Sequence, residues 1–167
     1  MSRELRILEY AMEMEKQGEK FYLKYKDDVE DKQTKKLFEN LAKIENEHYN
    51  ILKKHFDILS EGGDWSVMDS DLSGGEEIFE NVMKEEELLS KDYKSNLSDL
   101  AIMRMAYLIE NDFANFYDKA VETAEGEYEK KLLKYLSKWE HKHRELFYKE
   151  FKDLMEDNWF EQKFYPF

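Results

Sequence analysis

The chain contains no cysteine, and this absence excludes several kinds of chemistry at once. Without thiols, the 167 residues can form no disulfide, no zinc ribbon and no cysteine-bound iron centre. Proline is almost as scarce, because the single example is Pro166. A chain with no internal proline can form long helices without kinks.

The sequence also has few glycines, no long apolar run and no excess of positive charge. Four of the 6 glycines fall between residues 62 and 75, which marks the main break in the chain. No apolar run approaches the ~18 residues of a membrane span, and no segment reads as a signal peptide, so we expect a cytoplasmic protein that enters no membrane. The net charge of −13 disfavours binding to nucleic acid.

Four long segments have the apolar periodicity of amphipathic helices. We expect these helices over Ser2–Asp28, Lys32–Leu59, Leu97–Ala124 and Glu127–Met155. The first and last connections are short, whereas the middle one is long. This order predicts an all-α four-helix bundle of two repeated α-hairpins with one long crossover connection, similar to ferritin-like folds.

We expect one domain over residues 1–167, with hairpin one at 1–59, a crossover at 60–96, hairpin two at 97–156 and a tail at 157–167. Within the crossover, Ser60–Gly75 is predicted as loop and Glu76–Ser90 as a short helix. The tail is rich in aromatic residues, which predicts that it packs on the bundle or on a partner subunit. A homodimer is therefore expected.

An internal repeat of 95 residues is the sharpest signal in the sequence. Residues 8–59 align on 103–154 without a gap and share 16 identities in 52 positions. In each half, the first helix carries one glutamate in its apolar stripe and the second carries Glu-x-x-His. The repeated residues are Glu15, Glu45 and His48 in hairpin one, and Glu110, Glu140 and His143 in hairpin two.

The spacing of these residues places them in one layer. Glu15 and Glu45 are equally far from residue 30, and Glu110 and Glu140 are equally far from residue 125. At ~1.5 Å of rise per residue, the two glutamates of each hairpin therefore lie at the same height. Each histidine follows its glutamate by three residues and faces the same side of the helix.

Four buried carboxylates require compensating charge, because desolvating even one of them costs several kcal/mol. Two divalent cations would balance the four negative charges. Oxygen-rich ligation with one imidazole for each ion suits Fe(II) or Mn(II), and calcium does not favour imidazole. The pattern predicts a site for two iron ions, with manganese or another divalent metal as an alternative.

The two hairpins resemble the rubrerythrin-type branch of the ferritin-like superfamily. The resemblance is carried by Ala11–Glu15 with Phe21-Tyr22, by Ile44–His48, and by their repeats in hairpin two. It implies bridging roles for Glu45 and Glu140 and terminal ligation by Glu15 and Glu110.

This chain departs from that family in two ways. It has no cysteine-rich rubredoxin domain, which implies electrons from a separate donor protein. It also has Phe113 where rubrerythrins carry a further carboxylate. Three functions follow: an oxidoreductase that reduces peroxide or dioxygen, a ferroxidase or iron-binding protein, and a non-catalytic metallo-bundle.

Several other residues carry weaker expectations. Tyr22 and Tyr117 follow the first-helix glutamates by seven residues, either as core packing or as hydrogen-bond donors to metal ligands. No catalytic residue is assigned beyond these two candidates. The remaining polar candidates are expected at the surface, and the tryptophans are expected to pack: Glu13, Glu19, Glu47, His55, Glu85–Glu87 and His141, then Trp65, Trp139 and Trp159.

Overall fold

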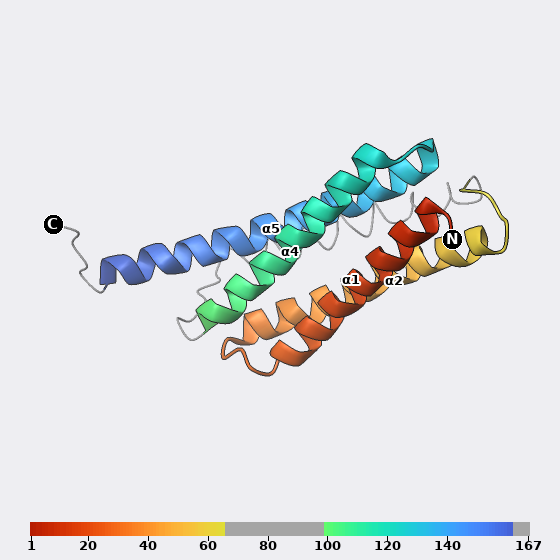
Figure 1. Ribbon diagram of the computed structural model, residues 1–167. Helices are drawn as coiled ribbons and strands as arrows, with labels where there is room; N and C mark the ends of the chain where they lie inside the picture. The colour runs from red at the N-terminus through yellow and green to blue at the C-terminus, as the bar shows by residue number, and fades with distance from the viewer. Residues whose placement is uncertain (66–98, 162–167) are drawn as a thin grey trace.

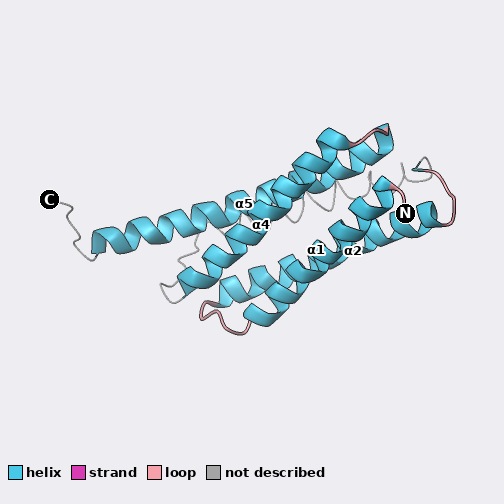
Figure 2. Cartoon of the chain, viewed as in Figure 1, coloured by secondary structure: helices cyan, strands magenta, loops and turns pink. Residues whose placement is uncertain are grey.

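The computed structural model describes residues 1–65 and 99–161, and within them it contains four α-helices and no strand. The helices are α1 (Arg3–Tyr25), α2 (Lys32–Ser60), α4 (Leu100–Thr123) and α5 (Glu127–Glu161). α1 and α2 pair as one antiparallel hairpin, and α4 and α5 pair as the other (Figure 1). Figure 2 shows only helices and the loops that join them in the coloured part of the chain. The predicted all-α four-helix bundle is confirmed.

The helix ends differ from the predicted ones where local chemistry decides. Ser2 is not helical but caps α1, because its hydroxyl accepts a hydrogen bond from the Leu5 N–H. Asp31 caps α2 in the same way through Thr34, and α2 begins at Lys32 as predicted. α5 continues beyond the predicted end at Met155, since no glycine or proline interrupts the chain before Glu161.

Several predictions fall on residues outside the described ranges. The predicted short helix over 76–90, most of the predicted loop over 60–75, and the contacts of the aromatic tail belong to this group. The same holds for Glu85–Glu87 and for the side chain of Trp159. None of the four described helices has the length and apolar character needed to cross a membrane.

Two polar clasps join the hairpins at opposite ends of the bundle. At one end, the buried Asp99 accepts hydrogen bonds from the backbone N–H groups of Glu30 and Asp31, in the loop between α1 and α2. At the other end, Arg3 forms a bidentate ion pair with the buried Glu129, with N–O distances of 3.0 and 3.1 Å. Each hairpin loop is thus held by the start of the other hairpin, so α1 and α4 run antiparallel (Figure 1).

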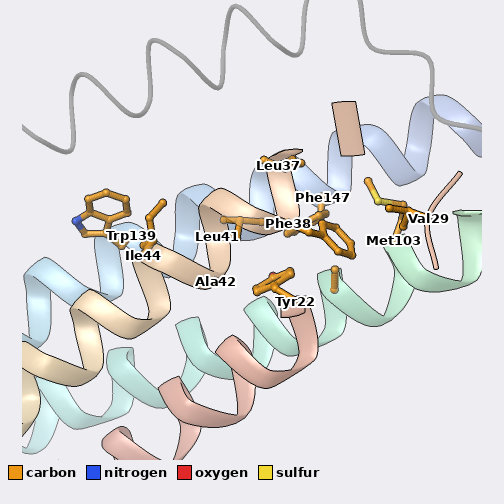
Figure 3. Packing of buried hydrophobic residues seen from close by; sticks show 11 residues of the cluster. Tyr22, Val29, Leu37, Phe38, Leu41, Ala42, Ile44, Met103, Trp139 and Phe147 are labelled. Carbon is orange, nitrogen blue, oxygen red and sulfur yellow. The ribbon is translucent and has the colours of Figure 1, made fainter. Parts of the chain in front are cut away.

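Two apolar clusters fill the interior between the helices. One is aromatic and includes Tyr22, Phe38 and Phe147, whose ring centroids lie 5.1 to 6.1 Å apart (Figure 3). The other is mainly leucine, with Leu8 and Leu52 among its buried members. On α1, Tyr22 and Leu8 lie on opposite sides of Glu15, so the clusters flank the level at which the predicted ligands occur.

Candidate metal centre

The six predicted ligands come together between the hairpins and are buried. Each is 0% exposed except His48, which is 2% exposed. They form two overlapping groups of four, and within each group one ligand atom from every residue lies within 4.8 Å of the others. Glu45 and Glu140 belong to both groups. The groups are Glu15, Glu45, His48 and Glu140, and then Glu45, Glu110, Glu140 and His143.

Every helix of the bundle contributes to this centre. α1 and α4 each supply one glutamate, and α2 and α5 each supply the Glu-x-x-His pair. A separation of three residues keeps both side chains of such a pair on the inner face of the helix. The register of the two hairpins then brings the four contributions to one height, as the repeat predicted.

The imidazoles lie within a ring of carboxylate oxygens. His48 Nδ1 is 3.3 Å from a Glu140 oxygen, 3.4 Å from one of Glu15 and 3.7 Å from one of Glu45. His143 Nδ1 is 3.6 to 3.9 Å from oxygens of Glu45, Glu110 and Glu140. Each histidine therefore faces carboxylates from three helices, an arrangement that could hold a metal ion.

Tyr22 and Tyr117 donate hydrogen bonds across the hairpin interface. The Tyr22 hydroxyl donates to Glu110, and the Tyr117 hydroxyl donates to Glu15. Both rings are fully buried. These residues therefore combine the two predicted roles, core packing and contact with a candidate ligand. Burial and the nearby carboxylates, first Glu110 for Tyr22 and first Glu15 for Tyr117, raise both phenol pKa values well above their ordinary value. The hydroxyls therefore keep their protons and remain donors.

The four glutamates have unequal proton affinities in the metal-free protein. Burial, followed by the charge of neighbouring carboxylates, raises the pKa of Glu45 and Glu140 well above the ordinary range. Burial also acts to raise the pKa of Glu15 and Glu110, but hydrogen bonds and the nearby imidazoles outweigh it and lower both. Without metal, the two shared glutamates are therefore the ones that hold protons.

The pKa of His48 is shifted in the opposite direction to that of a histidine that is buried without charged neighbours. Burial lowers its pKa, but the charge and hydrogen bond of Glu15, together with the nearby Glu45 carboxylate, outweigh burial and raise the pKa to about 10. The metal-free centre thus compensates for its negative charge with bound protons. A divalent cation would compete with these protons for the same atoms.

Many ligand atoms in the centre have no hydrogen-bond partner among the described residues. They include both oxygens of Glu45 and Glu140, one oxygen of Glu110, Nε2 of His48 and both ring nitrogens of His143. Buried polar atoms are normally satisfied, and leaving one without a partner costs about 1–3 kcal/mol. Carboxylate oxygens and imidazole nitrogens are ligands for divalent transition metals, so this set of atoms fits two such ions.

One aromatic residue contacts both imidazoles. The Trp139 ring lies edge-on to His48 and His143, with centroid distances of 5.3 and 5.7 Å. Sequence reasoning expected only packing at Trp139, which is 4% exposed. Under the 95-residue shift, Trp139 aligns with Ile44, directly before the repeated Glu140 and Glu45. This difference beside a repeated ligand position is the signal that could have indicated the location of Trp139 next to the centre.

The predictions for the two other histidines have different outcomes. His55 was expected at the surface, and this is wrong: it is 1% exposed, its Nδ1 lies 2.7 Å from the Ile51 carbonyl oxygen, and Trp65 packs beside its ring. His55 lies seven residues after His48, about two turns along nearly the same face of α2, so helical periodicity already indicated an inward position. His141 is partly exposed, with Nε2 2.8 Å from Asp118 and Nδ1 2.8 Å from Arg144. Neither histidine reaches the centre.

Comparison with known proteins gives one finding about the family. No curated protein and no solved structure matches the chain. A family model described as Rubrerythrin matches residues 6–152, a span that includes all six buried ligand residues and both tyrosines. Because this match extends over most of the sequence and the bundle has the corresponding repeated carboxylate and histidine positions, the chain belongs to the rubrerythrin family.

Proposed function

We propose that this protein is a non-haem di-iron oxidoreductase that reduces peroxide or dioxygen with electrons from a separate carrier protein. The observation that carries the proposal is the pair of four-residue groups that share Glu45 and Glu140. Two sites with shared carboxylates suit a pair of ions held close together. The family match agrees with such a centre.

In this proposal the chain's own residues bind, orient and exclude water. Glu15 and His48 would hold one ion, Glu110 and His143 would hold the other, and Glu45 and Glu140 would serve both. The tyrosine hydroxyls fix the orientation of Glu110 and Glu15 by donating to one oxygen of each. Complete burial of the six residues keeps bulk water away.

The redox chemistry belongs to the bound metal. When bound, two ferrous ions supply the two electrons that, together with two protons, convert hydrogen peroxide into two molecules of water. The chain contains no cysteine from which an iron–sulfur or rubredoxin-type donor could be built within these residues. We therefore assign the return of electrons to a separate one-electron carrier.

Metal content of the purified protein tests the site. Wild-type protein loaded anaerobically with Fe(II) should hold about two ions per chain, the number implied by one Glu-x-x-His on each of two helices. Glu45→Ala with Glu140→Ala removes both shared ligands and should reduce bound metal to near zero. Glu13→Ala with Glu47→Ala is the matched control, because both are exposed glutamates on the same two helices as Glu15 and Glu45. Two ions retained in the first double variant would contradict the proposed site.

The oxidant is tested by stopped-flow absorbance of the ferrous-loaded protein mixed separately with peroxide and with dioxygen. We expect peroxide to react faster. A reaction with dioxygen that is equally fast, with iron uptake beyond two ions per chain, would favour the ferroxidase alternative, which Phe113 in place of a further carboxylate supports. Absence of reaction with both oxidants would leave a structural metallo-bundle.

A further inference from the structure

The repeat breaks at one position next to the centre. Gly18 in α1 and Phe113 in α4 are counterparts under the 95-residue shift, each three residues after its glutamate ligand. The cross-hairpin bonds from Tyr22 to Glu110 and from Tyr117 to Glu15 set the register of α1 against α4. Gly18 lies about halfway between Glu15 and Tyr22, and Phe113 about halfway between Glu110 and Tyr117. The two residues therefore meet where α1 and α4 cross.

The Phe113 ring fills the space that a side chain at residue 18 would need. A Cβ atom built on Gly18 would lie 3.0 Å from Phe113 Cε2 and 3.4 Å from its Cζ. The same position lies 3.4 Å from Cγ of Glu45, one of the two shared glutamates. The ring is therefore lodged against the α1 backbone beside the methylene group of a bridging carboxylate.

This ring forms part of the enclosure of the centre. Phe113 is 6% exposed, whereas the four glutamates are 0% exposed, so a small part of Phe113 reaches the surface while the carboxylates do not. Trp139 contacts the two imidazoles supplied by α2 and α5. On the side of α1 and α4, Tyr22 and Tyr117 contact the carboxylates, and Phe113 packs between the two helices against Gly18.

We propose that Phe113 is the size-selecting residue of this centre: its ring, lodged against Gly18, admits small oxidants and excludes larger molecules. The inference rests on the proposed metal site. A ring that touches glycine backbone on one side can turn aside for a molecule of two to four atoms without moving a helix. A larger molecule would need the helices to separate, which the hairpin clasps at Asp99 and Arg3 oppose.

Anion binding to the cobalt-loaded protein tests this inference without any turnover. The visible spectrum of bound Co(II) changes when an anion joins its ligands. In the wild-type protein we expect azide to change the spectrum and benzoate to leave it unaltered. In Phe113→Ala, benzoate should also bind, at least about tenfold more tightly than to wild type, because the steric exclusion has been removed.

Two further variants separate size selection from general loosening. Met103→Ala empties an equally buried position on the same helix, seven residues before Glu110, and should keep the wild-type pattern. Phe113→Leu keeps most of the apolar volume and should give intermediate benzoate affinity, even if the alanine variant does not fold. Equal exclusion of benzoate by wild type, Phe113→Leu and Phe113→Ala would overturn the inference while leaving the metal site in place. Failure of wild-type protein to bind cobalt would instead overturn the proposed function, and the inference with it.

Discussion

The hydroxyls of Tyr22 and Tyr117 form hydrogen bonds to two of the candidate ligands, Glu110 and Glu15. Each donates to a glutamate of the other hairpin, so each phenol links a buried carboxylate to the opposite half of the bundle. A hydrogen bond to a ligand restricts its orientation and commonly contributes 10- to 100-fold to metal affinity. The geometry around the centre therefore depends on both halves of the chain.

Tyr22→Phe should weaken metal binding by about tenfold or more while leaving the number of ions unchanged, because the ring stays and only the donor is lost. Competition with a coloured chelator measures the affinity. Tyr25→Phe, in the same aromatic cluster, is the control and should bind metal as the wild type does. Equal affinities for the two variants would show that the Glu110 contact contributes nothing.

Trp139 should report directly on occupancy, because its indole contacts both imidazoles. We expect Fe(II) or Co(II) binding to quench the tryptophan fluorescence of the wild type and of Trp65→Phe. Trp139→Phe should lose most of this metal-dependent change. An unaltered response in Trp139→Phe would place the quenched tryptophan elsewhere.

The gathering of the six candidate ligands in one layer could be predicted from sequence because a shift of 95 residues preserves them, and each glutamate pair is symmetric about its turn. The partner of His55 could not be predicted in this way. His55 lies seven residues after His48, on nearly the same side of α2, which indicates burial, but its contact with Trp65 comes from the chain beyond the helix. Periodicity describes one helix at a time, whereas such a contact depends on what the rest of the chain brings.

At the scale of the helices, the four elements follow from apolar periodicity, and the starts of α1 and α2 follow from the capping side chains of Ser2 and Asp31. The clasps between hairpins have no such signature. Asp99 directs its carboxylate to the loop between α1 and α2 rather than to its own helix. Arg3 likewise reaches across 126 residues to Glu129. Isolated polar pairs of this kind are invisible until the hairpins are placed together.

Asp99→Ala should lower the free energy of unfolding by about 1–3 kcal/mol, since two backbone N–H groups lose a buried acceptor. Thermal or urea unfolding of the metal-free protein measures the change. Asp57→Ala, which removes an exposed ion pair with Lys53, is the control and should change stability by less than about 1 kcal/mol. If Asp99→Ala unfolds no more easily than Asp57→Ala, the clasp does not hold the hairpins.

For the whole molecule, the proposed metal site predicts that stability depends on bound metal. Ions that bind only the folded state stabilise it by mass action. Protein treated with EDTA should therefore melt at a lower temperature than protein loaded with Mn(II), as calorimetry would show. Identical melting temperatures would indicate that the ligands need no compensating charge.

The difference in melting temperature between metal-loaded and metal-free protein should grow as pH rises from about 6 to about 9. In the metal-free protein, the raised pKa values of Glu45, Glu140 and His48 mean that the folded state holds protons which the unfolded chain releases. That contribution is present at low pH and is lost as pH rises through the folded-state values, which for His48 is about 10. Glu15 and Glu110, whose pKa values are lowered, stay ionised in this window and add no slope. A metal-induced increase in melting temperature that becomes smaller as pH rises would contradict this expectation.

The pairing of Gly18 with Phe113 has a consequence for how such a bundle can be encoded. If two identical hairpins assembled as separate chains, the residue at the crossing would be the same on both sides. Two phenylalanines there would collide, and two glycines would leave a cavity beside the carboxylates. Joining both halves in one polypeptide removes that constraint, and Ile44 with Trp139 is a second small-and-large pair within one core cluster. A duplicated gene can thus keep its ligands in duplicate while the residues near the symmetry axis diverge, so one protein gains a closed, asymmetric surround for a symmetric site.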